Sequence, residues 1–243
     1  MVDSLSFVFP MYNEEENIER MVAATLAVAP KLAKRYELVI VDDASSDGCG
    51  KIADRLAVEH PEVRVIHHEV NRKLGGTLRT GFKAAKNDWI LYIDSDLPID
   101  MGSVPPAFSL TANADMVIGY RMNRNEGLRR AVMSWCYNRL IRLLFGLRVR
   151  DVNFSFKLFR RKILDEVRLF SEGSFIDAEL LIETARRGYR IREHGFMYYP
   201  RTKGESTLAG PGIVMKILAE MNGYRRRRKP VTRVEPEAEP ARR

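Results

Sequence analysis

Four short apolar runs, separated by segments with helical features, most strongly constrain how this chain can fold. They span residues 5–9, 38–41, 63–66 and 89–93, and a fifth run follows at residues 116–119. Parallel strands need a crossover of a dozen or more residues, usually a helix, and the spacing between these runs provides one. The pattern therefore predicts an α/β fold with a mostly parallel, doubly wound central sheet.

The segments between the runs carry helix signals. Asn13, followed by Glu16 three residues later, has the pattern of a capping box and predicts a helix through about residue 34. Further helices are expected up to about residue 60 and over residues 77–85, 128–145 and 177–187. Two later strands are expected over residues 154–159 and 195–199.

Composition narrows the class of protein. The chain has 243 residues and is 45% hydrophobic, enough to bury a sizeable core. Its two cysteines, Cys49 and Cys136, lie far apart, which argues against a structural zinc site or a disulfide scaffold. It shows no signal-peptide pattern and no apolar stretch of bilayer length. A cytoplasmic protein, soluble or peripheral at the inner face of the membrane, is expected.

The positive charge is concentrated in two stretches. Residues 121–162 contain 12 basic and 2 acidic side chains, and residues 224–243 contain 8 basic and 3 acidic, although the formal net charge of the whole chain is only +8. The rest of the chain is therefore acidic. Local basic patches on an acidic body favour specific anionic partners, such as phosphates or a lipid surface, over general nucleic-acid binding.

Polar groups follow three of the strands at the edge where an open parallel sheet binds its ligands. They form the segments Pro10-Met11-Tyr12-Asn13-Glu14, Asp42-Asp43-Ala44-Ser45 and Asp94-Ser95-Asp96. Asp94 and Asp96, with one residue between them, can share a hard cation such as Mg²⁺ or Mn²⁺ through their oxygens. Such a cation keeps positions open for substrate phosphates.

These segments, in this order, resemble family 2 glycosyltransferases, whose fold is the Rossmann-like, nucleotide-sugar-binding GT-A fold. Within that family the chain resembles dolichyl-phosphate mannose synthases and bacterial polyprenyl-phosphate glycosyltransferases. The segments 71–77 and 151–161 add to the likeness, which runs from about residue 5 to residue 207.

The resemblance implies a role for individual residues. It implies a nucleotide-sugar pocket lined by Pro10, Tyr12, Glu14, and Asp42 or Asp43. It also implies that Asp94 and Asp96 hold Mg²⁺ or Mn²⁺, and that Arg121 and Arg201 approach the phosphates. Pro98 stands where the dolichyl-phosphate enzymes commonly have a glutamine. Because proline offers no side-chain ligand, water or phosphate must complete the coordination.

The helix expected over residues 128–145 carries the predicted acceptor site. It has a broad apolar side, and Arg130, Ser134, Asn138 and Arg142 share another side. Related enzymes use arginines and a serine in this region for a lipid phosphate, which implies Arg129, Arg130 and Ser134 here. An ordinary surface helix with solvated arginines is the alternative. Phe154-Ser155 also departs from the Ser-Gly usual in relatives.

Three regions are predicted: a GT-A domain over residues 1–210, an amphipathic and basic segment on the membrane surface over residues 211–229, and a disordered tail over residues 230–243. Five successive basic residues, 225–229, would support reversible binding to an anionic leaflet. A membrane-protein partner is a second means of attachment.

The resemblance implies inverting transfer of a sugar from GDP-mannose or a UDP-hexose to a polyprenyl phosphate. Asp96, Arg121 and Asp177 are the expected catalytic residues. An anionic acceptor needs no general base. A hydroxyl acceptor would need one, and Asp177 is then the candidate, followed by Glu179. A more remote alternative is a non-catalytic protein that binds anions or membranes through its basic patches.

Overall fold

The computed structural model describes residues 1–123, 128–199 and 211–227, without the side chains of residues 128–131 and 211–216. The tail predicted over residues 230–243 lies outside the described residues. The described strands are β1 Val2–Met11, β2 Ala33–Asp42, β3 Val63–His67, β4 Trp89–Tyr92, β5 Met116–Arg121, β6 Lys157–Arg160 and β7 Ile191–Phe196. The helices are α1 Ile18–Leu32, α2 Cys49–Glu59, α3 Lys73–Ala84, α4 Pro105–Phe108, α5 Leu128–Phe145, α6 Ile163–Glu166, α7 Phe175–Arg186 and α8 Pro211–Arg227.

The seven described strands form one sheet in the order β3-β2-β1-β4-β6-β5-β7. The pairs β1–β2, β2–β3, β1–β4 and β5–β7 are parallel. β6 is antiparallel to both of its neighbours, β4 and β5. The predicted α/β fold with a mostly parallel sheet is confirmed, and β6 is the strand that separates β5 from the parallel group.

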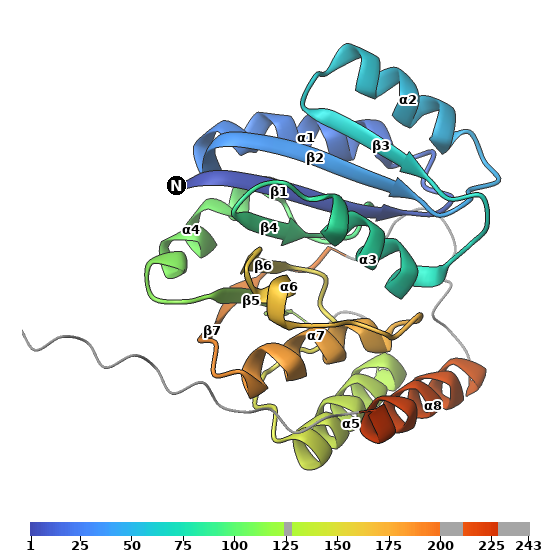
Figure 1. The fold of residues 1–243 in the computed structure, drawn as a ribbon, viewed down its shortest axis with the longest axis vertical. Helices are drawn as coiled ribbons and strands as arrows, with labels where there is room; N and C mark the ends of the chain where they lie inside the picture. The colour runs from blue at the N-terminus through green and yellow to red at the C-terminus, as the bar shows by residue number, and fades with distance from the viewer. Residues whose placement is uncertain (124–127, 200–210, 228–243) are drawn as a thin grey trace, which may run out of the picture.

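Alternating residues of the central strands build a core on each face of the sheet. Phe7 and Phe9 of β1 pack in one core with α1, α2 and α4. Val8 points to the other core, which contains side chains of α3, α5, α6, α7 and α8. α1 and α2 lie on one side of the sheet in Figure 1, and α3 and α7 lie on the other. The period of two therefore sends alternate side chains of β1 into the two cores.

Several element boundaries differ from those expected. The first helix begins at Ile18 instead of near Asn13, because the Asn13 side chain accepts a hydrogen bond from the Ser46 N–H and does not cap a helix. This helix ends at Leu32, since Ala33 is already extended and pairs with Val2.

Other boundaries shift in a similar way. The helix expected from residue 77 begins at Lys73, and the helix expected from residue 177 begins at Phe175. The strand expected over residues 154–159 begins at Lys157, because the preceding residues turn and bring Asp151 against Arg121. The last strand, expected over residues 195–199, is Ile191–Phe196, where it pairs with β5.

Gly81 allows α3 to approach the sheet closely. A Cβ atom added at Gly81 would lie 2.4 Å from Cγ1 of Val8 and 3.3 Å from Cγ2 of Val41, two fully buried side chains. We expect Gly81→Ala to lower the free energy of unfolding by about 1–3 kcal/mol, because this core has no room for the methyl group. Urea denaturation measures the change.

Gly223→Ala in α8 is the matched control. Its added Cβ would meet its nearest neighbour, the end of the Arg227 side chain, at an ordinary 3.6 Å. This change should leave stability unchanged or raise it by up to about 1 kcal/mol, because alanine favours helices. Equal effects of the two substitutions would contradict the close approach of α3.

Candidate active site at the carboxyl edge of the sheet

The loops after β1 and β2 are joined by reciprocal hydrogen bonds at the carboxyl edge of the sheet. The Asn13 N–H donates to Ser45 Oγ at 3.0 Å, and the Ser46 N–H donates to Asn13 Oδ1 at 2.8 Å. A second exchange links Glu15 N–H to Asp47 Oδ2 and Gly48 N–H to Glu15 Oε2. These bonds fix the two loops against each other, whereas the sequence predicted only that they lie at the same edge of the sheet.

Four non-glycine residues in the described part of the chain have left-handed backbone, and they follow the carboxyl ends of four successive strands, Lys73 being the first residue of α3. They are Asn13 after β1, Ala44 after β2, Lys73 after β3 and Leu97 after β4, with φ of 55°, 60°, 59° and 49°. Such backbone costs of the order of 1–3 kcal/mol per residue and is found where the surrounding structure requires it, often at functional sites. The strain therefore gathers at the edge where a ligand is expected.

The residues expected at the nucleotide differ in exposure. Tyr12 is exposed at 40%, whereas Glu14 is buried and its Oε2 accepts a hydrogen bond from Asn17 Nδ2 at 2.7 Å. The Pro10 carbonyl accepts from the Ser95 hydroxyl at 2.7 Å, which ties the first loop to the Asp94-Ser95-Asp96 segment. All three strand ends thus meet in one place, as the sequence predicted.

Asp42 and Asp43 are each paired with a histidine that the sequence did not single out. His67 Nδ1 lies 2.8 Å from Asp42 Oδ2, and His68 Nδ1 lies 2.7 Å from Asp43 Oδ1. Asp43 also accepts from the Arg72 N–H at 2.8 Å. These contacts orient both carboxylates at the end of β2, and the missed signal was two adjacent histidines at the end of a neighbouring strand.

Asp94, Asp96 and Asp177 form an acidic cluster beyond β4. Asp94 Oδ1 accepts a hydrogen bond from the Tyr92 hydroxyl at 3.0 Å. Burial, together with the nearby carboxylates of Asp96 and Asp177, raises the pKa of Asp94 to about 7. The fold therefore brings together, from the loop after β4 and from α7, three carboxylates whose negative charges repel one another.

The donor set of this acidic cluster suits a hard divalent cation. It consists of carboxylate oxygens, and burial together with the charges of Asp96 and Asp177 raises the pKa of Asp94, so a nearby cation would favour its ionised form. Within residues 1–123, 128–199 and 211–227, no group of three or more His, Cys, Asp or Glu side chains is arranged to hold a metal ion. Asp94 and Asp96 would therefore share a cation with oxygens from water or substrate.

Asp177 faces a buried lysine. Lys157 Nζ lies 2.6 Å from Asp177 Oδ1, and the two side chains are exposed by 1% and 6%. Burial raises the pKa of Asp177, although Lys157 opposes the shift. Lys157 was missed because it stands in the middle of an otherwise apolar strand pattern.

Arg121 is paired with the buried carboxylate of Asp151. Its Nε and one terminal nitrogen donate to the two oxygens of Asp151 at 2.7 and 3.0 Å. The guanidinium also lies 5.8 and 5.3 Å from the ring centroids of Phe154 and Tyr198. Asp151 is buried, and its charge contributes to the raised pKa of Asp177, so Arg121 borders the acidic cluster.

The expected acceptor residues are described in part. Ser134 is half-buried on α5, whereas the side chains of Arg129 and Arg130, and Arg201 as a whole, lie outside the described residues. One turn beyond Ser134, the Asn138 side chain accepts from the Val152 N–H at 3.1 Å and donates to the Arg150 carbonyl at 3.3 Å. α5 is therefore bound to the loop that carries Asp151.

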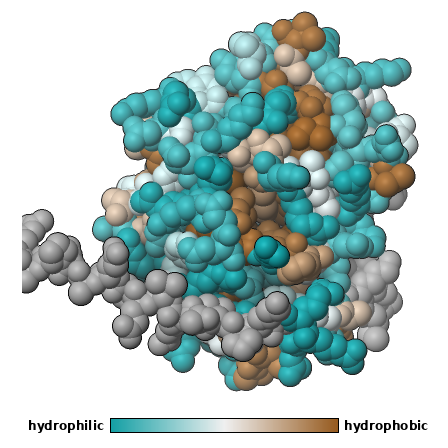
Figure 2. Space-filling view, in the orientation of Figure 1, coloured by the Kyte–Doolittle hydropathy of each residue, from teal (hydrophilic) through white to brown (hydrophobic). Residues whose placement is uncertain are grey.

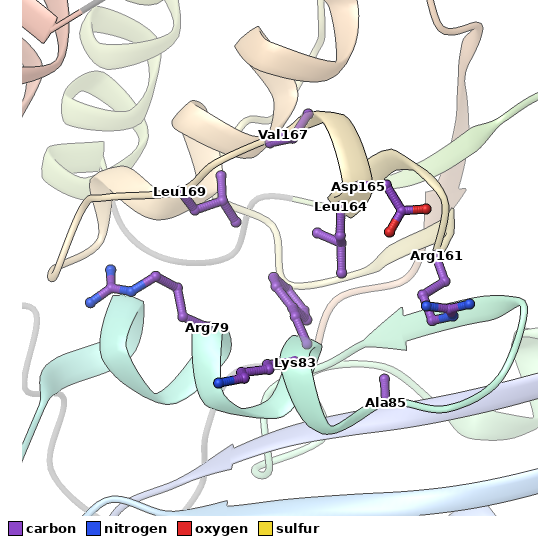
Figure 3. Close-up of a pocket in the computed structure, with 9 residues that line it drawn as sticks. Arg79, Lys83, Ala85, Arg161, Leu164, Asp165, Val167 and Leu169 are labelled. Carbon is purple, nitrogen blue, oxygen red and sulfur yellow. The ribbon is translucent and has the colours of Figure 1, made fainter.

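A pocket of about 370 Å³ lies away from this edge, between α3 and α6. Figure 2, drawn in the orientation of Figure 1, shows apolar side chains in a hollow near the middle of the surface that faces the viewer. Figure 3 shows Arg79 and Lys83 of α3 on one side and Leu164, Asp165 and Leu169 on the other. The pocket contains none of the predicted site residues, so the carboxyl edge remains the candidate active site.

Comparison with known proteins agrees with this placement. The family described as glycosyl transferase family 2 matches residues 6–168. The chain belongs to this family. It is similar to the undecaprenyl-phosphate mannosyltransferase of Micrococcus luteus, with 30% identity over 85% of this chain and 88% of that protein.

Two other relatives are longer proteins. Dodecaprenyl-phosphate galacturonate synthase of Rhizobium johnstonii is 32% identical over 80% of this chain, which spans 61% of that protein. Glycosyltransferase AglD of Haloferax volcanii is 31% identical over 81% of this chain, which spans 33% of that protein. This family 2 chain thus matches only a part of each.

Among solved structures, this family 2 chain resembles glucosyl-3-phosphoglycerate synthase from Mycobacterium tuberculosis in complex with Mn²⁺ and UDP-glucose. The TM-score is 0.71 at 19% identity, covering 91% of this chain and 78% of that chain. At this identity the likeness establishes the fold, and the predicted GT-A fold is confirmed.

The pKa of His67, compared with that of His194, tests the electrostatics at the end of β3. Burial opposes protonation of His67, but Asp54 and Asp42 raise its pKa above 6.5, whereas burial lowers the pKa of His194 below 6.5. Histidine NMR titrations should therefore show His67 titrating at the higher pH. Because the pKa of His67 is higher in the folded state, its pairing stabilises the fold below about pH 6.5, and this contribution is lost as pH rises through the folded pKa.

Asp54→Asn should move the pKa of His67 back towards 6.5 and leave that of His194 unchanged, since Asp54 Oδ1 lies 3.0 Å from His67 Nε2. The reverse order of the two histidines in the wild-type titration would contradict the described pairing.

Proposed function

We propose that this chain transfers a sugar from a nucleotide diphosphate sugar, GDP-mannose or a UDP-hexose, to a polyprenyl phosphate, with inversion at the anomeric carbon. Its relatives named for undecaprenyl-phosphate and dodecaprenyl-phosphate chemistry support this acceptor class. The observation that carries the proposal is the acidic cluster of Asp94, Asp96 and Asp177, placed where an open α/β sheet binds its ligand.

In the proposed reaction an oxygen of the acceptor phosphate attacks the anomeric carbon. The bond from that carbon to the diphosphate breaks, and the nucleoside diphosphate leaves with the electron pair. Asp94 and Asp96 would hold Mg²⁺ or Mn²⁺, which supplies charge neutralisation for the leaving diphosphate when bound. The structure similar to this chain that contains Mn²⁺ and UDP-glucose supports a divalent ion in this fold.

The chain's own residues supply orientation and charge. Pro10, Tyr12, Glu14, Asp42 and Asp43 would line the nucleotide pocket, while Arg121 and Arg201 would approach the phosphates. Arg129, Arg130 and Ser134 would receive the acceptor phosphate. Since Asp177 is ion-paired with Lys157 at 2.6 Å, an acceptor that arrives already ionised suits the site better than a hydroxyl that needs Asp177 as a base.

A membrane surface is the proposed location of this reaction, at the cytoplasmic face. Among the helices of the described part, none is long and apolar enough to cross a bilayer. α5 exposes Val132, Trp135 and Leu143 to solvent by 51%, 64% and 68%, beside the exposed Arg139 and Arg142. Apolar and aromatic side chains mixed with arginine suit the interface of an anionic bilayer.

The described apolar side chains of α8 pack against the protein core, whereas residues 211–229 were expected to form an amphipathic segment on the membrane surface. Met221 and Tyr224 are buried against the core beside α7, and Tyr224 contacts the rings of Phe145 and Phe175. The described apolar side of α8 is therefore used within the protein. Exposed Arg225, Arg226 and Arg227 remain for the proposed contact with lipid phosphates.

The activity is tested with labelled GDP-mannose and UDP-hexoses, Mg²⁺ or Mn²⁺, and a polyprenyl phosphate, by counting label in the organic phase. Asp96→Asn should lower transfer by at least about 100-fold, because one of two carboxylates facing the cation becomes neutral. Removal of divalent cations with EDTA should have the same effect.

Asp100→Asn is the matched control on the same loop. Asp100 is exposed and accepts from the Gly102 N–H at 2.9 Å, a role that asparagine can keep. Transfer should stay near the wild-type rate. Lipid labelling that persists in Asp96→Asn would contradict the proposal, and label reaching only soluble hydroxyl acceptors would move the assignment to the alternative with Asp177 as base.

Membrane contact is tested by flotation with vesicles containing anionic phospholipid. The double substitution Trp135→Gln and Leu143→Gln should lower binding by at least about tenfold, because it removes two exposed apolar side chains from the proposed interface. Val58→Gln is the control, since Val58 is 88% exposed on α2, on the opposite side of the sheet. Equal loss for both variants, or no loss for the α5 variant, would contradict the assignment.

A further inference from the structure

Lys157 is a buried cation within the proposed active site. It is the first residue of β6 and is 1% exposed, although lysine is almost never fully buried unless it is paired. Its Nζ lies 2.6 Å from Asp177 Oδ1 and donates to the Phe154 carbonyl at 2.8 Å. It also lies 5.3 Å from the centroid of the Tyr92 ring.

Two neighbouring elements, β4 and α7, place electron-rich or acidic groups near Lys157. From β4, Tyr92 faces the ammonium with its ring and donates from its hydroxyl to Asp94. From α7, the Asp177 carboxylate forms an ion pair with the ammonium. The negative charges of Asp177 and Asp96 both act on Asp94. Asp151 is also near Asp177, but its two oxygens are bound by Arg121.

The charges of this arrangement can be counted. Asp94, Asp96 and Asp177 contribute three negative charges when ionised, and Lys157 contributes one positive charge. Asp151 and Arg121 form a neutral pair beside them. With all three carboxylates ionised, the state that a bound cation would favour, the acidic cluster and its lysine carry two net negative charges, which match one divalent cation.

We infer that Lys157 is a positioning residue for the proposed reaction. Its ammonium compensates Asp177 and fixes that carboxylate near Asp94, so that the acidic cluster has the charge to take up one divalent cation, with Asp94 and Asp96 as the ligands. The register of the sheet places it there, because Lys157 stands opposite Tyr92 in the β4–β6 pair. Asp177 then acts through charge and does not transfer a proton. This inference rests on the proposed function.

The test is a double-mutant cycle read out by Mn²⁺ binding, measured by electron paramagnetic resonance without any sugar donor. Asp177→Asn should weaken Mn²⁺ binding by at least about tenfold, because it leaves the Lys157 charge uncompensated beside Asp94. Adding Lys157→Met to Asp177→Asn should restore binding to within about threefold of wild type, since the pair is then removed as a unit.

Two further variants separate charge from structure. Lys157→Arg keeps a positive charge that can pair with Asp177, and it should bind Mn²⁺ within about threefold of wild type, even if Lys157→Met by itself does not fold. Glu183→Gln is the matched control, because Glu183 lies on the same helix and is also ion-paired, with Arg186 and Arg187, away from the acidic cluster. It should leave Mn²⁺ binding unchanged.

Transfer assays distinguish positioning from proton transfer. Asp177→Asn should lower kcat with little change in KM for the acceptor, and the double variant should recover most of the lost kcat. A double variant that binds Mn²⁺ like the wild type yet stays as inactive as Asp177→Asn would overturn the inference, because Asp177 would then be the base.

The inference is also overturned if folded Asp177→Asn, judged by near-ultraviolet circular dichroism, binds Mn²⁺ like the wild type, or if the double variant binds as weakly as Asp177→Asn. Failure of the proposed function has a different signature. The wild-type protein would then transfer no sugar to polyprenyl phosphate, while the Mn²⁺ cycle would still give the expected pattern and support the charge compensation by Lys157.

Discussion

The ion pair between Lys157 and Asp177 is the interaction on which the candidate active site depends. Both side chains are almost fully buried, and their charged atoms lie 2.6 Å apart. Burying two charges has a large desolvation cost, which is offset only where geometry and further contacts are good. Here the Phe154 carbonyl and the Tyr92 ring provide those contacts. Removing one partner would leave an uncompensated charge beside Asp94.

The rest of the carboxyl edge is built around this pair by hydrogen bonds between loops. Tyr92 connects the pair to Asp94, and Ser95 connects the same segment to Pro10. The loops after β1 and β2 hold each other through Asn13, Ser45 and Ser46. Each of these loops contains a residue with left-handed backbone. The surrounding hydrogen bonds offset the free-energy cost of that conformation. The edge is therefore preorganised, which suits the proposed binding of a flexible diphosphate.

The sequence predicted the parts of the fold and the site that depend on local pattern. Apolar runs with helices between them indicated a mostly parallel sheet, and the polar segments beginning at Pro10, Asp42 and Asp94 do converge at one edge. The family resemblance is confirmed by the match over residues 6–168. The roles of individual site residues remain predictions.

What the sequence could not predict depends on register between distant strands. Lys157 meets Tyr92 because β6 inserts antiparallel next to β4, and His67 meets Asp42 because β3 pairs with β2 in that register. A pattern along one strand shows which residues face the core, but it does not show which residue of another strand stands opposite. The pairing of Arg121 with Asp151 could not be predicted for the same reason. Asp151 lies in a turn just before residues 154–159, which were expected to form a strand.

We propose that Asp94 and Asp96, beyond β4, would hold a divalent cation together with the diphosphate of the donor. The most direct measurement is anomalous diffraction at the manganese edge from crystals grown with Mn²⁺ and a nucleoside diphosphate. We predict one strong peak within coordinating distance of oxygens of Asp94 or Asp96 and of the diphosphate. A diphosphate bound in the pocket with the Mn²⁺ peak remote from both carboxylates would contradict this account.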